Sequence, residues 1–101
     1  MPREFLCKIG DIPEGAPKEV RSQRGRKVCV TREGTTVYAC QAACPHKGIA
    51  LAEAVVEGTT LTCLEHLWQW DLRSGEALGM AEETLRVFVV EVDGDSVYIK
   101  P

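Results

Sequence analysis

Apolar and polar residues alternate along most of the chain, with the period of two that is typical of half-buried β-strands. The alternation is clearest in residues 27–31 and 85–92, which are rich in valine. The second of these segments is followed by Asp93-Gly94 and then by the strand-like residues 96–100, which predicts a C-terminal hairpin. Five further strands are predicted over residues 5–9, 18–22, 35–40, 59–62 and 67–71.

Many short strands at regular spacing indicate an all-β fold, which we expect to be an antiparallel β-sandwich or partly open barrel. Two segments depart from the alternation. We expect a short helical turn or an irregular path over residues 51–56 and a loop over residues 79–83. With 101 residues, the chain has room for one domain, 1–101, with a small core.

The composition is that of an ordinary globular protein, with 45% hydrophobic and 27% charged residues. No apolar run reaches the length of a membrane-spanning helix. The segment after Met1 resembles a strand and lacks the apolar core of a signal peptide. We therefore expect a cytoplasmic protein that does not contact membranes.

The net charge of −3 is distributed unevenly. Residues 1–32 carry eight basic and four acidic groups, whereas residues 33–101 carry four basic and eleven acidic groups. The acidic balance argues against nucleic acid as a partner. It suits docking to basic patches on other proteins, although each single charge is equally well explained as a solvated surface group.

Four side chains that can bind metal ions are concentrated in two short segments, Cys44-Pro45-His46 and Cys63-Leu64-Glu65-His66. The chain contains only these two histidines. Zinc fingers usually pair cysteine with cysteine and histidine with histidine, whereas each segment here supplies one of each. A tetrahedral zinc site is one possibility. The other is a [2Fe–2S] cluster in which two histidines replace two cysteines on one iron, so that each segment would bind both irons.

Together with its flanks, this pattern resembles the Rieske-type iron–sulfur proteins. Residues 41–43 before the first segment and 66–71 after the second extend the likeness, which is greatest to the small ferredoxins of multicomponent aromatic oxygenases, and especially of toluene monooxygenases. The resemblance implies a Rieske-type β-fold with a cluster-binding subdomain, about residues 41–70, formed by two ligand loops. It also implies that one [2Fe–2S] cluster is bound by four residues, Cys44 and Cys63 on one iron and His46 and His66 on the other.

The resemblance further implies a carrier of single electrons. Its partners would be a flavin-containing, NADH-dependent reductase and an oxygenase hydroxylase, and the His-Leu-Trp run at 66–68 favours a diiron monooxygenase. With no further histidine in the chain, we expect an electron-transfer component and not an enzyme. The alternatives are the ferredoxin of a Rieske non-haem iron dioxygenase and a Rieske-like small subunit of nitrite reductase. We expect a monomer, the usual state of a mobile carrier.

The remaining cysteines and the two tryptophans have simpler predicted roles. Cys7, Cys29 and Cys40 are expected to be small, buried apolar residues, since disulfides are rare in cytosolic proteins. Trp68 and Trp70 are expected to pack in the core. The alternative is that they form a shield or docking surface beside the cluster. High-potential Rieske proteins have hydroxyl donors at the comparable positions, so we predict a reduction potential near the low end of the Rieske range, roughly −150 mV.

Overall fold

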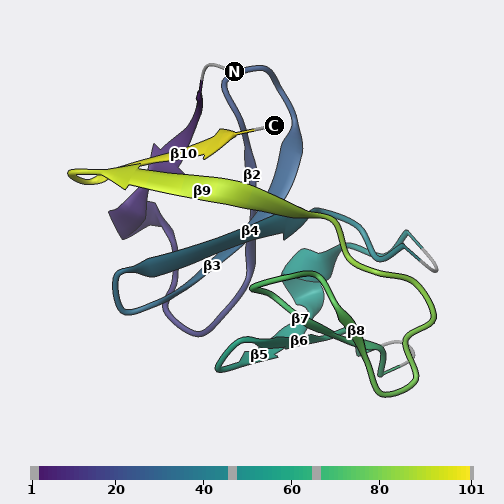
Figure 1. The fold of residues 1–101 in the computed structure, drawn as a ribbon. Helices are drawn as coiled ribbons and strands as arrows, with labels where there is room; N and C mark the ends of the chain where they lie inside the picture. Colours follow the sequence, from purple (N-terminus) through teal and green to yellow (C-terminus); the bar gives the residue numbers. More distant parts are fainter. Residues whose placement is uncertain (1–2, 46–47, 65–66, 101) are drawn as a thin grey trace.

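The computed structural model describes residues 3–45, 48–64 and 67–100, which form two antiparallel sheets at opposite ends of the molecule (Figure 1). The six-stranded sheet has the order β1-β10-β9-β4-β3-β2, and the four-stranded sheet has the order β5-β6-β7-β8. The large sheet consists of β1 (Glu4–Lys8), β2 (Lys18–Arg21), β3 (Lys27–Glu33), β4 (Thr36–Gln41), β9 (Val87–Asp93) and β10 (Ser96–Lys100). The small sheet consists of β5 (Val55–Glu57), β6 (Thr60–Thr62), β7 (Gln69–Asp71) and β8 (Ala77–Leu78). The predicted all-β antiparallel fold is confirmed.

The large sheet curves into a partly open barrel. Its edge strands β1 and β2 approach each other, and the Gln23 amide donates a hydrogen bond of 2.8 Å to the Phe5 carbonyl. The Glu4 carboxylate accepts a hydrogen bond from the Ser22 hydroxyl and forms an ion pair with Arg26 at 3.2 Å. On the other side the barrel stays open, because β4 and β9 pair only through Ala39–Phe88 and Cys40–Val87. Figure 1 shows β9 diverging from β4 beyond this point.

Two separate groups of buried side chains fill the two ends. The core of the large sheet is aliphatic and includes Ile12, Val28, Val30 and Ile99. The second core lies between the ends of β3 and β4 and the small sheet, and it contains cysteines and tryptophans besides leucines. Its buried members are Cys29, Cys40, Cys44, Leu51, Leu61, Cys63, Trp68, Trp70, Leu72 and Leu85.

The predicted strands agree with the structure except around the small sheet. Residues 51–56, expected to be helical or irregular, divide into the 3-10 helix η2 (Leu51–Glu53) and strand β5. The prediction missed β5 because it is only three residues long and is joined to β6 by a tight turn at Gly58, where φ is 60°. It also missed β8, a strand of two residues. A second 3-10 helix, η1 (Ile9–Asp11), follows β1.

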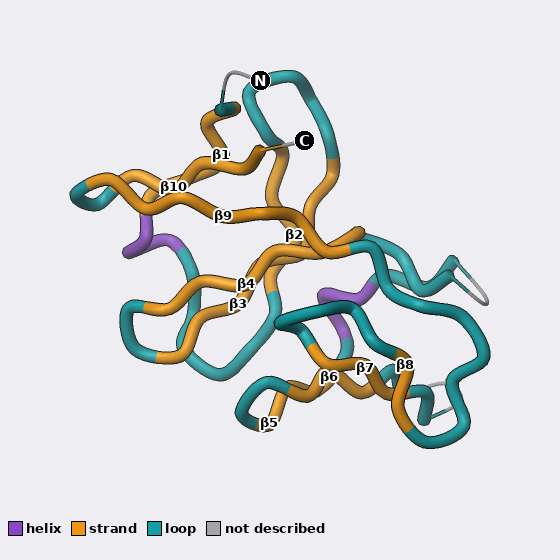
Figure 2. Tube along the Cα trace, in the orientation of Figure 1, coloured by secondary structure: helices purple, strands orange, loops and turns teal. Residues whose placement is uncertain are grey.

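Strand β7 begins at Gln69 rather than at the predicted Leu67. Leu67 has a φ of 58°, which ends the extended conformation before the strand starts. Loops make up most of the molecule around the short strands of the small sheet (Figure 2). Among the described residues, no helix is both long and apolar enough to cross a membrane.

Candidate metal centre

The first candidate loop starts at Cys44, three residues after β4 ends. The Cys44 amide donates to the Ile49 carbonyl and the Gly48 amide donates to the Cys44 carbonyl, both at 2.8 Å. Gly48 has a φ of 69°, a conformation that glycine adopts without a steric penalty. The loop is anchored at its base by an isolated bridge between Ala43 and Ala50.

The second loop repeats this arrangement. The Cys63 amide donates to the Trp68 carbonyl and the Leu67 amide donates to the Cys63 carbonyl, again both at 2.8 Å. In each loop the bonds join the cysteine to the residues four and five positions later. Cys44 and Cys63 therefore occupy equivalent positions in two loops of the same backbone design, and Leu67 is the counterpart of Gly48.

The two cysteines are buried in the same core. Cys44 is 3% exposed and Cys63 is 2% exposed, and neither forms a disulfide. A cavity of about 160 Å³ adjoins the second loop and is lined by Cys63 and Leu64 together with residues of the 49–54 segment. The structure thus places two of the four predicted ligands in equivalent positions. The other two, His46 and His66, lie outside the described residues.

The arrangement of these cysteines fits a metal centre held by thiolates. Two unoxidised sulfur donors lie in matching loops of a small, largely apolar core, where a free thiolate would be poorly solvated. Within the described residues, no group of three or more His, Cys, Asp or Glu side chains gathers as a complete metal site. The two cysteines are thus a partial ligand set, one from each loop.

Trp68 and Trp70 pack beside the two loops. Their rings contact each other edge to face, with centroids 6.2 Å apart, and both side chains are buried. The Trp70 indole N–H donates a hydrogen bond of 2.8 Å to the Glu83 carbonyl. The burial of both side chains therefore supports a role in core packing. The Trp70 indole N–H is already hydrogen-bonded to the Glu83 carbonyl of the third loop.

This third loop, residues 79–86, contains no proline. Two of the hydrogen bonds that hold it join it to β7 and to the turn that follows β7. One is the bond from Trp70 to Glu83. The other is at Gly75, whose carbonyl accepts a hydrogen bond of 2.8 Å from the Leu85 amide. A Cβ at position 75 would lie 2.0 Å from the Leu85 carbonyl oxygen. The sequence run Arg73-Ser74-Gly75 predicts only a turn, because a close approach of a distant segment leaves no local signal.

The remaining cysteines are buried, as predicted. Cys29 and Cys40 face each other across β3 and β4. The hydrogen bond between their thiols, together with burial, raises the pKa of Cys40 well above its ordinary value. Burial also raises the pKa of Cys7 to about 11. The Cys7 and Cys40 thiols therefore remain protonated at neutral pH, which is the state of an inert, structural cysteine.

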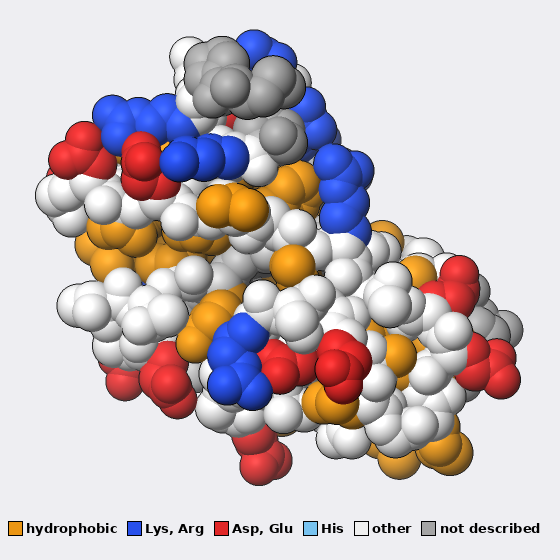
Figure 3. Space-filling view, viewed as in Figure 1, with side chains coloured by type: hydrophobic (Ala, Val, Ile, Leu, Met, Phe, Trp, Pro, Cys, Tyr) orange, Lys and Arg blue, Asp and Glu red, His pale blue; other side chains and the backbone are white. Residues whose placement is uncertain are grey.

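The charges of the two ends differ in sign. Residues 41–85 carry two basic and seven acidic groups, a net −5, whereas the rest of the chain carries ten basic and eight acidic groups, a net +2. Figure 3 shows Lys and Arg side chains gathered over the large sheet, with Asp and Glu prominent around the small sheet. Arg73 is paired with Asp71 at 2.8 Å, and this pair lowers the pKa of Asp71.

Residues 3–91 match the model of the Rieske [2Fe-2S] domain. The chain belongs to this family. It is 36% identical over 92 residues to the ferredoxin subunit of methanesulfonate monooxygenase from Methylosulfonomonas methylovora, covering 89% of this chain and 74% of the relative. It is 31% identical to the ferredoxin component of biphenyl 2,3-dioxygenase from Rhodococcus jostii, covering 93% and 88% of the two chains.

Solved structures of Rieske ferredoxins have the same fold. The ferredoxin of carbazole 1,9a-dioxygenase from Nocardioides aromaticivorans superposes with a TM-score of 0.88 at 24% identity, over 100% of this chain and 99% of that one. The ferredoxin in a complex with the oxygenase of carbazole 1,9a-dioxygenase has a TM-score of 0.82 at 26% identity, over 94% and 89% of the chains.

Family membership settles the type of metal centre. The cofactor is a Rieske-type [2Fe–2S] cluster, and zinc is no longer an alternative. The protein is a Rieske ferredoxin, an electron carrier rather than an enzyme. The more specific relation to toluene monooxygenases and the four ligand assignments remain predictions.

Proposed function

We propose that this ferredoxin delivers single electrons to the terminal oxygenase of a multicomponent oxygenase system, and that it receives them from a flavin-containing, NADH-dependent reductase. The matching cysteine loops of a small chain are the observation that carries this proposal. These loops would hold a redox centre. Among the described residues, no second group of side chains suited to substrate chemistry accompanies them. The names of the two relatives, a monooxygenase and a dioxygenase ferredoxin, support the same role.

We assign the cluster to four ligands, Cys44 and Cys63 on one iron and His46 and His66 on the other. The two loops supply one cysteine and one histidine each, so neither loop would bind the cluster alone. When bound, the cluster accepts one electron and releases it again. The buried thiols of the two cysteines would be deprotonated as iron ligands, and the surrounding apolar side chains exclude water from them.

The cluster-binding subdomain, proposed as about residues 41–70, holds both loops. Strand β8 and the third loop contact it through β7, which pairs with β8 and whose Trp70 side chain donates to the Glu83 carbonyl. We expect the protein to act as a monomer, because a carrier that alternates between two partners needs a small surface for transient contacts.

We favour a diiron monooxygenase as the final acceptor, on the basis of the His-Leu-Trp run at 66–68. The second candidate is a Rieske non-haem iron dioxygenase, which the likeness to the biphenyl dioxygenase ferredoxin favours. The aromatic or other substrate binds the oxygenase, so this chain carries no trace of it.

Reconstitution tests the proposal. The holoprotein is combined with an NADH-dependent flavin reductase and, in turn, with purified diiron hydroxylases and Rieske dioxygenases. We expect product formation that depends on both NADH and the ferredoxin with at least one oxygenase, and faster turnover with a diiron hydroxylase. Rapid reduction of the cluster without product formation from any oxygenase would contradict an oxygenase as the acceptor.

A further inference from the structure

Strand β4 ends at Gln41, whose side chain takes the place of its own backbone carbonyl in the sheet. The last β4–β9 pair joins Cys40 to Val87, and continuing this register places Gln41 opposite Arg86. In a hydrogen-bonded antiparallel pair, each residue's amide donates to the other's backbone carbonyl. The Gln41 amide does donate to the Arg86 carbonyl, at 2.9 Å. The Arg86 amide instead donates to the side-chain oxygen Oε1 of Gln41, at 2.8 Å.

This substitution of side chain for backbone lets the chain turn out of the sheet into the first ligand loop. The other end of the same amide group, Nε2, donates to the Ala43 carbonyl at 2.6 Å. The two partners fix the orientation of the amide, because a carbonyl requires the NH₂ group and an N–H requires the oxygen. One side chain therefore binds the third loop at Arg86 and the first ligand loop at Ala43.

The peptide unit that joins Ala43 to Cys44 is held on both sides. Its carbonyl accepts the hydrogen bond from Gln41, and its N–H donates to the Ile49 carbonyl at 2.8 Å. The first of these bonds ties the loop to the sheet, whereas the second closes the loop on itself. The position of the Cys44 backbone relative to the rest of the molecule therefore depends directly on the Gln41 amide.

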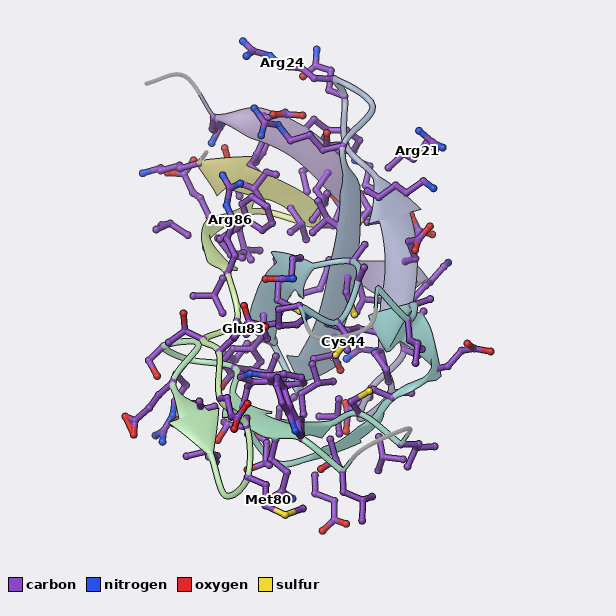
Figure 4. All side chains as sticks on the ribbon, turned by 90° about the vertical axis from the view of Figure 1, so that its right-hand side faces the viewer. Arg21, Arg24, Cys44, Met80, Glu83 and Arg86 are labelled. Atoms are coloured by element: carbon purple, nitrogen blue, oxygen red, sulfur yellow. The ribbon has the colours of Figure 1, made fainter. Side chains whose placement is uncertain are left out.

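The third loop extends this connection to the second ligand loop. Figure 4 shows the third loop running from Met80, at the small-sheet end, past Glu83 to Arg86, close to the large sheet. The Glu83 carbonyl accepts a hydrogen bond from the indole of Trp70, which lies in β7, the strand that leaves the second ligand loop. The third loop is thus bound to the first ligand loop through Gln41 and to the second through Trp70.

We infer that Gln41 is a positioning residue, whose side-chain amide fixes the place of Cys44 relative to the second ligand loop. The inference rests on the proposed assignment of Cys44 and Cys63 as ligands of one iron. Two ligands of one iron must keep a constant separation, so a group that anchors the peptide unit of one ligand determines how firmly the cluster is held. Glutamine meets this need because its amide is a donor and an acceptor at once.

Two substitutions at Gln41 test the inference. Gln41→Glu preserves the size of the side chain and the acceptor for the Arg86 amide, but it places a second acceptor against the Ala43 carbonyl. Gln41→Leu removes both side-chain hydrogen bonds. Each holoprotein is mixed with an iron chelator in native buffer, and the decay of visible absorption gives the rate of cluster release. We expect release to be about tenfold faster in Gln41→Glu and faster still in Gln41→Leu.

Two further readouts distinguish positioning of a ligand from a general contribution to stability. The EPR signal of both reduced variants should be broadened, because the Cys44 loop would no longer be held in one position. Hydrogen exchange of the segment around Arg86 should be faster in Gln41→Leu but remain at the wild-type rate in Gln41→Glu, which keeps that acceptor.

Gln23→Leu is the matched control. The Gln23 side-chain oxygen also accepts a hydrogen bond from a backbone amide, that of Phe5 at 3.4 Å, where β1 approaches β2 in the large sheet. This bond has no connection to either ligand loop. We expect Gln23→Leu to release its cluster at the wild-type rate and to show the wild-type EPR line width.

Wild-type release rates and an unbroadened signal in both Gln41 variants would overturn the inference. An equal acceleration in Gln23→Leu would also overturn it, since cluster retention would then follow overall stability. If Gln41→Leu does not fold, the isosteric Gln41→Glu alone decides. The wild-type spectrum separates this inference from the proposed ligands. A Rieske-type signal with unaffected variants would refute the role of Gln41 alone, whereas the g values of an all-cysteine cluster would overturn the ligand assignment and the inference with it.

Discussion

The two ends of this ferredoxin are built in different ways. The large sheet has strands of four to seven residues, and its core is mainly aliphatic. The small sheet has strands of two or three residues, and its core contains four cysteines and both tryptophans. In the large sheet, hydrogen bonds between paired strands satisfy the backbone N–H and C=O groups. In the small-sheet region, the loops satisfy these groups through individual hydrogen bonds, such as the one from the Cys63 amide to the Trp68 carbonyl.

This difference indicates where each region obtains its stability. Burial of aliphatic side chains stabilises the large sheet without a cofactor. The small sheet has too few ladder bonds to fix its loops, so the cluster and a few specific contacts must hold them. Metal binding and local folding are therefore coupled in the small-sheet region and nearly independent of each other in the large one. The following predictions test this comparison, from the largest expected effect to the smallest.

Replacement of a proposed ligand should have the largest effect. We expect Cys63→Ser to abolish cluster binding, because serine lacks the soft thiolate that iron–sulfur clusters require. Cys40→Ser is the matched control, since Cys40 is equally buried in the same core but is protonated and paired with Cys29. It should bind the cluster and lose about 1–3 kcal/mol of stability. Iron content and visible absorption measure the first effect. Loss of the cluster in Cys40→Ser but not in Cys63→Ser would reverse the assignment.

The close approach of Gly75 to Leu85 should be the next most sensitive point. An alanine Cβ would lie 2.0 Å from the Leu85 carbonyl oxygen, at a φ of 80°. We expect Gly75→Ala to lower the free energy of unfolding by about 4 kcal/mol. Gly94→Ala, in the β9–β10 turn of the large sheet, meets no atom within 4 Å and should cost about 1 kcal/mol. Urea unfolding of both holoproteins compares them, and equal losses would contradict the importance of this contact.

Trp70 should contribute more than a buried residue of the large sheet. Trp70→Phe removes part of a fully buried ring and leaves the Glu83 carbonyl without its donor, which should cost about 3 kcal/mol. Ile99→Val, at an equally buried position in β10, should cost about 1 kcal/mol. Hydrogen exchange should show the first loss in the small sheet and third loop. A loss spread evenly over both sheets would mean that the two ends unfold as one unit.

Much of this organisation follows from the sequence, for physical reasons that differ between the two ends. The long strands of the large sheet, such as β3 and β9, repeat the apolar alternation often enough to be recognised. A strand such as β8 contains two residues, too few for any periodicity. Its existence depends on pairing with Gln69 and Trp70, which are brought close only in the folded chain.

The site likewise combines features that a short stretch of sequence predicts with features that depend on contacts between distant segments. The ligand pattern is local in sequence, and the two cysteines of this pattern lie buried in the same core. The equivalence of the two loops depends on backbone hydrogen bonds and on the positive φ of Leu67, which no composition rule predicts for a leucine. Likewise, the contacts of the third loop with Trp70 and Gly75 join distant segments and could be found only in the structure.

The smallest expected effect concerns acid stability at the closure of the large sheet. The pKa of Glu4 lies below its usual value of 4.5, mainly because the Ser22 hydroxyl donates to the carboxylate, with help from the Arg24 amide and Arg26. The ionised form therefore stabilises the fold fully above pH 4.5, and this contribution is lost as the pH falls through the lower folded pKa. We expect Glu4→Gln to be less stable at neutral pH and to approach wild type in acid.

Thermal unfolding between pH 2 and 7 measures this dependence. Glu19→Gln, on the exposed edge strand β2, is the control and should follow the wild-type curve. A constant difference between Glu4→Gln and wild type over the whole range would show that Glu4 acts through packing rather than through its charge.

The central claim is that one cysteine and one histidine from each loop bind a single [2Fe–2S] cluster. Low-temperature EPR of the purified protein, before and after reduction with dithionite, tests it most directly. We predict a silent oxidised state and, on reduction, a rhombic spin one-half signal whose mean g value lies below that of clusters bound by cysteine alone. A reduced, iron-replete protein with the g values of an all-cysteine cluster, or with no signal, would contradict the assignment of both histidines.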